Sequence, residues 1–265
     1  MKVILPGIMG RMGKVLCEAV SQHEALSLAG GTVRPGSTFA GQDAGALVLG
    51  RACDAPIVEQ LDQIESADCG LIDFTTLELL PQNLAWCVEH RVPMVIGTTG
   101  LNDALKAQIL DASAQIPIVF APNMSVGVNV MQRLIRLAAE LVGEHSDIEV
   151  IEAHHRHKKD APSGTAVRLG EVLADAMGWQ LDDVAVYGRE GITGERPHKQ
   201  IGFETIRAGD VFGDHTVLFA AEGERIEITH KASSRMTFAK GAARAMAWLA
   251  DKPAGLYSMD DVLGL

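Results

Sequence analysis

The start of the chain constrains the fold more than any other segment. Lys2–Leu5 form a short, mostly apolar run, and glycines follow at Gly7, Gly10 and Gly13. Beyond these glycines, apolar residues recur at the three- and four-residue spacing of a helix as far as Val20. A buried strand, a glycine loop and a helix, in this order, are typical of the opening unit of a dinucleotide-binding fold.

Each glycine has a physical role in such a loop. Gly7 allows the tight turn, Gly10 lets a backbone N–H approach a phosphate, and Gly13 lets the helix pack close to the sheet. Arg11, at the start of the helix, either reaches that phosphate or lies in solvent. The spacing is Gly-x-x-Gly-x-x-Gly rather than the usual Gly-x-Gly-x-x-Gly, so a glycine turn that binds nothing remains an alternative.

Strands and helices alternate through the first half of the chain. The apolar spacing predicts helices near 81–90 and 102–112, and strands at 26–33, 70–74, 93–97 and 117–120. Strands that alternate with helices predict a doubly wound parallel sheet.

The pattern changes after Asn123. A long helix near 127–142 and a strand at 147–153 precede a helix from Ser163, and period-two strands then fall within 200–207, 215–220 and 226–231. These strands predict a mixed or antiparallel sheet with one covered face. A last helix, 234–249, is expected to pack on the first domain, with no strand after it.

The predicted fold class is therefore α/β, a Rossmann-like doubly wound parallel sheet with a second α+β domain built on a mixed sheet. The expected dinucleotide-binding domain is 1–125 plus 234–265, and the expected domain for substrate binding and oligomerisation is 126–233.

The composition excludes several classes of function. The chain has a formal net charge of -11, which argues against general nucleic-acid binding. No apolar run approaches the roughly 20 residues that span a bilayer, and the first residues do not resemble a signal peptide. The four cysteines are scattered without a Cys-x-x-Cys pair, which is typical of free thiols in a reducing compartment. We expect a cytoplasmic protein without a membrane or nucleic-acid partner.

A second candidate site lies in the middle of the chain. Six consecutive residues, His154–Lys159, are cationic or can become so, and Ser163 then begins a helix. A helix N-terminus beside Lys and His side chains can bind an anion, and the same side chains can give protons near neutral pH. A structural role for His157, and a solvated surface for Arg156 and Lys159, remain alternatives.

The residues at the end of the second predicted strand indicate which nicotinamide cofactor is preferred. It reads Thr32-Val33-Arg34 and has no carboxylate to bind a ribose hydroxyl, whereas Arg34 suits a 2′-phosphate. This predicts a preference for NADPH, with NADH possible. The loops Gly97–Gly100 and Ala121–Met124 follow later strands and are expected to line the nicotinamide end, unless they are ordinary turns.

Several motifs are similar to those of one enzyme family. They are Gly7–Gly13, Asp73–Thr75, Val95–Gly100, Ser125–Val130, Glu152–Lys158, Ala161–Ala166, Gly188–Gly191, Arg207–Asp210 and His230–Met236. The chain resembles the 4-hydroxy-tetrahydrodipicolinate reductases, also called dihydrodipicolinate reductases, over nearly its whole length. The His-His-Arg-His-Lys segment followed by Ser-Gly-Thr is the most specific of these motifs.

The resemblance implies a reaction and a set of residues. The substrate, a cyclic dicarboxylate of lysine and diaminopimelate biosynthesis, loses water, and the conjugated ring accepts a nicotinamide hydride. His154 matches the general acid and Lys158 the second proton donor. The matched substrate contacts are His155, Lys158, Ser163, Gly164 and Thr165. The matched cofactor contacts are Gly7, Ile8, Met9, Gly10, Arg11, Met12, Gly97, Thr98, Thr99, Ala121, Pro122, Asn123 and Met124. The family usually forms homotetramers, and we expect no metal site in this chain.

Three other functions remain open at this stage. His154, His155 and His157 would ligate zinc in a metal-dependent hydrolase, although adjacent Lys and Arg would repel the ion. A non-enzymatic NADPH sensor would use the first domain alone. A related two-domain NADPH reductase of another small acid would share the fold without needing the histidine segment.

Overall fold

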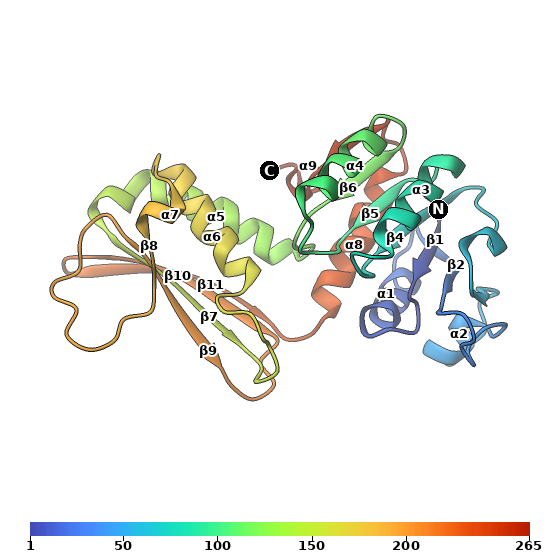
Figure 1. Ribbon diagram of the computed structural model, residues 1–265, viewed down its shortest axis with the longest axis horizontal. Coiled ribbons are helices and arrows are strands. Elements are labelled where there is room, and N and C mark those ends of the chain that lie inside the picture. Colours follow the sequence, from blue (N-terminus) through green and yellow to red (C-terminus); the bar gives the residue numbers. More distant parts are fainter. The chain divides into compact units, whose positions relative to one another are not determined.

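The computed structural model describes residues 1–265 and contains two compact units (Figure 1). One unit comprises Met1–Val126 and Arg235–Leu265, and the other comprises Gly127–Ser234. No helix combines the length and the apolar character that crossing a membrane requires.

The first unit is built on a seven-stranded parallel sheet. Its order is β12-β6-β5-β4-β1-β2-β3, and the strands are β1 Lys2–Pro6, β2 Ser27–Thr32, β3 Ile57–Val58, β4 Cys69–Asp73, β5 Met94–Ile96, β6 Pro117–Phe120 and β12 Gly255–Tyr257. From β1, an interior strand, the chain first adds β2 and β3 on one side and then β4, β5 and β6 on the other. This reversal is the switch point beside which open parallel sheets bind ligands. The Rossmann-like prediction is confirmed.

Helices cover both faces of this sheet. They are α1 Arg11–Ser21, α2 Ala44–Val48, α3 Leu80–His90, α4 Asp103–Ser113, α8 Met236–Leu249 and α9 Met259–Leu263, with a 3-10 turn at Leu61–Gln63. Val3 and Leu5 of β1 join one apolar cluster with residues of α1 and α8, whereas Ile4 joins another with residues of α3 and α4. The alternation follows from the pleat, since successive strand side chains point to opposite faces.

The end of the chain corrects one prediction. Helix α8 packs on α1 within the first unit, as expected. The prediction that no strand follows it is wrong, because Gly255–Tyr257 pairs in parallel with Pro117–Val119 as edge strand β12. Three residues are too few to show a period-two pattern, and the pairing partner is distant in sequence.

The second unit is built on a mixed five-stranded sheet. Its order is β11-β10-β7-β9-β8, and the strands are β7 Asp147–His154, β8 Ala185–Tyr187, β9 Ile201–Arg207, β10 Gly213–Ala221 and β11 Glu224–Ala232. The pairs β7–β9 and β8–β9 are parallel, and β10 pairs antiparallel with β7 and β11. The predicted mixed sheet is confirmed.

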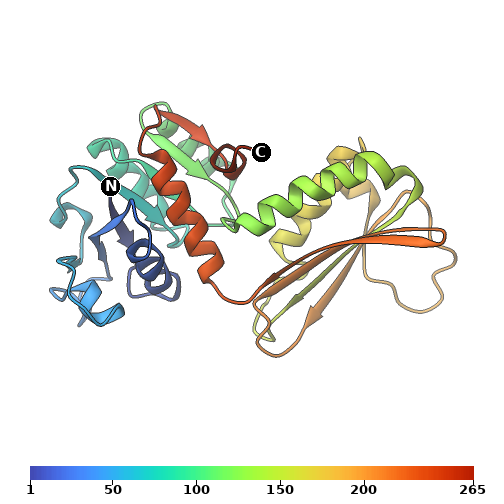
Figure 2. The same ribbon diagram turned by 180° about the vertical axis from the view of Figure 1, so that it is seen from behind.

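Helices lie on one face of this second sheet. Helices α5 Val126–Val142 and α6 Gly164–Ala176 run along that face, and α7 Leu181–Val184 follows (Figure 2). Along β7 every second residue is buried, namely Ile148, Val150, Glu152 and His154. The first two join the apolar core under the helices. Glu152 and His154, which are polar, therefore occupy inward-facing positions at the end of the strand, beside the N-terminus of α6.

Candidate functional site

The glycine loop after β1 is shaped by two close approaches. Gly7 has a φ of 67°, which favours glycine, and its carbonyl accepts the N–H of Gly10 at 2.8 Å. A Cβ on Gly13 would clash with the carbonyls of Gly7 and Ile8, so only glycine lets α1 start this close to β1. The Gly10 N–H closes the turn. The first turn of α1, at Arg11 and Met12, has no carbonyl one turn earlier in the helix for its N–H groups, so these are the donors that a helix start offers to an anion.

A cavity of about 530 Å³ adjoins this loop in the first unit. Gly7, Met9 and Gly10 line one side, and the segment from Val33 to Phe39 lines the other. Arg34 is exposed there, and the Gly36 N–H donates to Glu59 Oε1 at 2.7 Å, which holds the segment in place. A phosphorylated dinucleotide fits this cavity. The backbone N–H donors at the start of α1 and the exposed guanidinium of Arg34 can both bind phosphate. Ile8, by contrast, is fully buried, so only its backbone is available to such a ligand.

A buried carboxylate joins two loops at the same edge of the sheet. Asp73, at the end of β4, is fully buried and accepts four hydrogen bonds. The donors are Thr75 N at 2.9 Å, Thr75 Oγ1 at 2.8 Å, Asn83 Nδ2 at 2.7 Å and Thr98 Oγ1 at 2.8 Å. The bond to Asp73 therefore fixes the side chain of Thr98. Gly97 lies against the ring of Phe74, and Thr99 is exposed.

The loop after β6 is fixed by close packing. Ala121 and Met124 are buried, Pro122 is exposed, and Asn123 Oδ1 accepts the N–H of Ser125 at 2.9 Å. A Cβ on Gly241 of α8 would clash with the Met124 carbonyl, so α8 supports this loop directly. All the predicted cofactor residues thus follow the carboxyl ends of β1, β2, β5 and β6, where parallel sheets bind ligands.

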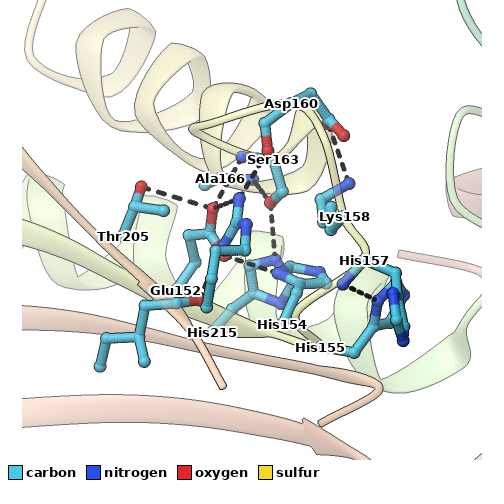
Figure 3. Close-up of polar contacts among 12 residues, drawn as sticks. Glu152, His154, His155, His157, Lys158, Asp160, Ser163, Ala166, Thr205 and His215 are labelled. Carbon is cyan, nitrogen blue, oxygen red and sulfur yellow. Dashed lines mark hydrogen bonds and ion pairs between the residues drawn. The ribbon is translucent and has the colours of Figure 1, made fainter. Parts of the chain in front are cut away.

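The histidine segment of the second unit contains a buried charge cluster (Figure 3). His154 is 8% exposed, and its Nδ1 lies 2.5 Å from Glu152 Oε2. Glu152 is 1% exposed and accepts two hydrogen bonds from Arg207, NH1 to Oε2 at 2.8 Å and NH2 to Oε1 at 2.8 Å. The pairing register explains the cluster, because β9 places Thr205 beside Glu152 and Arg207 beside His154.

The contact between Glu152 and His154 opposes the effect of burial on the pKa of each group. Burial would raise the pKa of Glu152, but hydrogen bonds from Arg207, His154 and Ser163 outweigh it and lower that pKa. Burial lowers the pKa of His154 below its usual 6.5, and Glu152 opposes the shift while Lys158 and Arg207 add to it. Glu152 is therefore an anion at neutral pH, and His154 is mostly neutral when no substrate is bound.

The N-terminus of α6 meets the same cluster. Ser163 Oγ accepts the Ala166 N–H at 3.1 Å, which confirms the predicted N-cap, and the Ser163 N–H donates to Glu152 Oε1 at 2.9 Å. Gly164 is exposed, and a Cβ there would meet nothing within 4 Å. Gly164 thus leaves space for an anion at the first turn of α6.

A second buried histidine lies behind Ser163. His215 of β10 is 4% exposed, its Nε2 lies 3.0 Å from Ser163 Oγ, and its ring meets that of His154 edge-on at 5.1 Å. Burial, with a further contribution from His154, lowers the pKa of His215 to about 4.

This shift predicts a pH-dependent stability. Unfolded His215 binds a proton near pH 6.5 and folded His215 near 4, so the unfolded chain binds more protons between these values. The free energy of unfolding should therefore fall as pH falls from about 6.5 to 4, by up to about 3 kcal/mol from this residue. Urea unfolding at several pH values should show a flatter profile for His215→Gln. His145→Gln, an exposed control, should keep the slope of the original, and equal slopes in both variants would contradict the assignment.

The remaining residues of the segment form the loop after β7. Lys158 Nζ lies 2.8 Å from Asp160 Oδ2, which lowers the pKa of Asp160, and the Lys158 side chain is 21% exposed. His155 Nδ1 accepts the His157 N–H at 3.2 Å, and the two rings lie 6.0 Å apart. Arg156 and Lys159 are exposed. No group of three or more His, Cys, Asp or Glu side chains is arranged to hold a metal ion.

Several polar residues were not singled out as site residues from the sequence. Asp73, Glu152 and Arg207 lie inside family motifs without an assigned role, and the sequence gives no indication of a role for His215 or Glu59. Glu152 was detectable, because it lies two residues before His154 on a strand and must share its face. Arg207 and His215 are brought there by strand pairing over 50 residues away in sequence, which local pattern does not reveal.

Comparison with known proteins shows the family of the chain. The family models described as "Dihydrodipicolinate reductase, N-terminus" and "Dihydrodipicolinate reductase, C-terminus" match residues 1–124 and 127–263. Two proteins of Pseudomonas fluorescens strains named 4-hydroxy-tetrahydrodipicolinate reductase are 57% and 56% identical over 266 residues, covering 100% of this chain and 99% of each relative.

Solved structures agree on the fold. A dipicolinate-bound dihydrodipicolinate reductase from Paenisporosarcina sp. TG-14 has a TM-score of 0.76 at 22% identity, with 97% of both chains covered. An amine dehydrogenase from Mycobacterium smegmatis has a TM-score of 0.60 at 13% identity, with 98% of this chain and 95% of that one covered.

The fold and these relatives define a two-domain oxidoreductase that uses a pyridine nucleotide. Within that class, the chain belongs to the dihydrodipicolinate reductase family, whose two models together span almost all of it.

Proposed function

We propose that this enzyme reduces 4-hydroxy-tetrahydrodipicolinate to tetrahydrodipicolinate in lysine and diaminopimelate biosynthesis. The substrate loses water, and the conjugated ring then gains a hydride and a proton. The observation that best supports this reaction is the placement of His154, held by Glu152, beside Lys158 and the open N-terminus of α6. That arrangement combines a proton donor with two anion-binding groups, as a cyclic dicarboxylate requires.

The proposed roles follow from these positions. His154 gives the proton, and Lys158 binds a carboxylate and stabilises negative charge as it develops on the ring. The second carboxylate binds the first turn of α6 at the N–H groups of Gly164 and Thr165, with buried Ser163 as the cap that holds this turn and His155 as a further contact. The neighbour from Paenisporosarcina is described as binding dipicolinate, also a cyclic dicarboxylate, which supports this choice of substrate.

The cofactor is proposed to bind the first unit, where it supplies the hydride. The first turn of α1 and the glycine loop would bind its phosphates, and the loops Gly97–Thr99 and Ala121–Met124 would line its nicotinamide. Arg34, exposed beside the cavity and next to Val33 rather than an acidic residue, would bind the 2′-phosphate of NADPH. We therefore propose NADPH as the preferred cofactor, with NADH also accepted.

Removing the Arg34 side chain should remove that preference. Arg34→Ala is expected to raise the KM for NADPH roughly 10- to 100-fold, because hydrogen bonds between charged groups contribute about 1.5–3 kcal/mol. The KM for NADH should change less than about twofold, since NADH has no 2′-phosphate. Steady-state kinetics with both cofactors measure this, and Arg51→Ala, another exposed arginine of the same unit, is the control. An equal rise for both cofactors would contradict the role of Arg34.

We also propose a cytoplasmic homotetramer. The sheet of the second unit has α5 and α6 on one face (Figure 2), and its other face carries the apolar side chains Ile151, Ile206 and Leu218. Ile206 is 50% exposed in the single chain. Exposed apolar side chains on such a face would contact a second copy, in agreement with the tetramers usual in the family.

The reaction itself is tested with the purified chain. The dicarboxylate product of the preceding pathway step is supplied as substrate, and the loss of NADPH absorbance is followed. Oxidation of NADPH that depends on both the substrate and this protein supports the proposal. A protein that binds NADPH but does not oxidise it under these conditions would instead be a nucleotide sensor.

A further inference from the structure

Glu152 is the most deeply buried charged group in the second unit, and the proposed reaction gives it no direct part. It connects its own strand β7, strand β9 through Arg207, and the cap of α6 through the Ser163 N–H. Its remaining strong contact is with His154 Nδ1. We infer that Glu152 is a positioning residue, which holds the His154 ring so that Nε2 is the nitrogen that gives the proton. This inference rests on the role of His154 proposed above.

The first step is that Glu152 accepts hydrogen bonds only. Arg207 donates to both of its oxygens, Ser163 N donates to Oε1, and Thr205 Oγ1 lies 3.5 Å from Oε1. A carboxylate with this many donors stays ionised, and the lowered pKa of Glu152 agrees.

The second step concerns the two ring nitrogens. An ionised carboxylate 2.5 Å from Nδ1 requires a proton on Nδ1, whether the ring is neutral or charged. The proton that His154 exchanges with substrate or solvent is therefore the one on Nε2. A Cβ on Gly213 would lie 3.1 Å from Nε2, so glycine at this position leaves room beside the reactive nitrogen.

The third step is the charge balance around the ring. Glu152 faces it from β7, Arg207 from β9, His215 from β10 and Lys158 from the following loop. Glu152 alone among these favours the protonated ring. In the transfer, the N–H bond at Nε2 breaks, its electron pair stays on the ring, and the proton forms a C–H bond on the reduced substrate. Neutral His154 keeps its Nδ1 proton, Glu152 stays ionised, and solvent returns a proton to Nε2.

Nitrogen NMR of the unmodified protein tests the orientation without any catalysis. In ¹⁵N-histidine-labelled protein, the His154 signals are assigned by their loss in His154→Gln. Neutral His154 should have its proton on Nδ1 and a bare Nε2. A neutral ring protonated on Nε2 would overturn the inference.

The substitution Glu152→Gln tests the consequence for the reaction. The Gln carbonyl should take the Oε1 position, where Ser163 N, Arg207 NH2 and Thr205 converge, which places its amide N–H₂ against Nδ1 and gives up the Arg207 NH1 bond to Oε2. The amide would then donate to Nδ1 and move the ring proton to Nε2, as NMR would show. We expect kcat to fall at least about tenfold, because the wrong tautomer is fixed. The alkaline limb of the pH–rate profile should shift to lower pH, because the favourable charge is lost.

A matched control is available on the same strand. Glu149 also pairs with arginines, Arg189 at 2.8 Å and Arg196 at 3.0 Å, but it faces the opposite side of β7. Glu149→Gln should leave the His154 tautomer and the pH–rate profile unchanged. Glu152→Gln with the kcat, profile and tautomer of this control would overturn the inference. Full activity of His154→Gln would instead overturn the proposed role of His154 as the acid, and absence of substrate-dependent NADPH oxidation by the unmodified protein would overturn the proposed function, so the failures are distinguishable.

Discussion

Replacing His154 by glutamine should lower kcat by about 10²- to 10⁴-fold, the contribution typical of a positioned general acid. Glutamine keeps much of the volume of the ring and its hydrogen-bonding character, but it cannot give a proton. The KM for the dicarboxylate should change much less than kcat, because Lys158 and the first turn of α6 remain. Steady-state kinetics over a range of substrate concentrations separate the two effects.

The role of His154 as an acid also predicts the direction in which the rate changes with pH. The acid must be protonated to act, so the rate should fall as pH rises through the pKa of His154. Burial lowers that pKa in the free enzyme, and bound carboxylates should raise it. The alkaline limb of kcat/KM, which reports the free enzyme, should therefore lie at lower pH than the limb of kcat. His145→Gln, an exposed histidine of the same unit, should keep both limbs. A kcat for His154→Gln within threefold of the original would contradict the assignment.

Replacing Lys158 by alanine should lower kcat/KM by roughly 10²- to 10³-fold, as the loss of one preorganised electrostatic contact does. Both constants should change, because the ammonium group binds the substrate and also stabilises charge as it develops. KM should rise and kcat should fall, and unchanged values of both would contradict the proposed role.

The ion pair between Lys158 and Asp160 affects how the Lys158→Ala variant is interpreted. Its carboxylate pairs with Lys158 at 2.8 Å, so Lys158→Ala leaves an unpaired anion near the bound dicarboxylate. The double variant Lys158→Ala, Asp160→Asn removes that repulsion. If the loss of the ammonium dominates, the double variant should recover less than about tenfold. Lys159→Ala, the adjacent exposed lysine, should change kcat/KM less than threefold.

The architecture of the first unit was largely readable from the sequence. Apolar runs followed by helical spacing locate β1, α1 and the later parallel strands, because each is long enough to show its period. The glycine loop was readable because its geometry admits no Cβ at Gly13. Strand β12 was not readable, since its three residues have no period and its partner β6 lies far back in the chain.

The candidate site was readable only in part. The sequence places His154, Lys158 and the Ser163 cap within one segment, because they are neighbours in the chain. It could not show that His154 is buried against Glu152, or that Arg207 and His215 lie beside it, because those contacts depend on the register of β7 with β9 and β10. Nor could it show that Lys158 pairs with Asp160, which is a choice of rotamer in a loop.

A crystal structure with pyridine-2,6-dicarboxylate, a stable analogue of the substrate, tests the central claim most directly. One carboxylate should lie within hydrogen-bond distance of Lys158 Nζ, about 2.7–3.2 Å, and the other against the N–H groups of Gly164 and Thr165. His154 should present Nε2 to the ring, with Nδ1 still on Glu152. A dicarboxylate bound elsewhere, away from His154 and Lys158, would contradict the account.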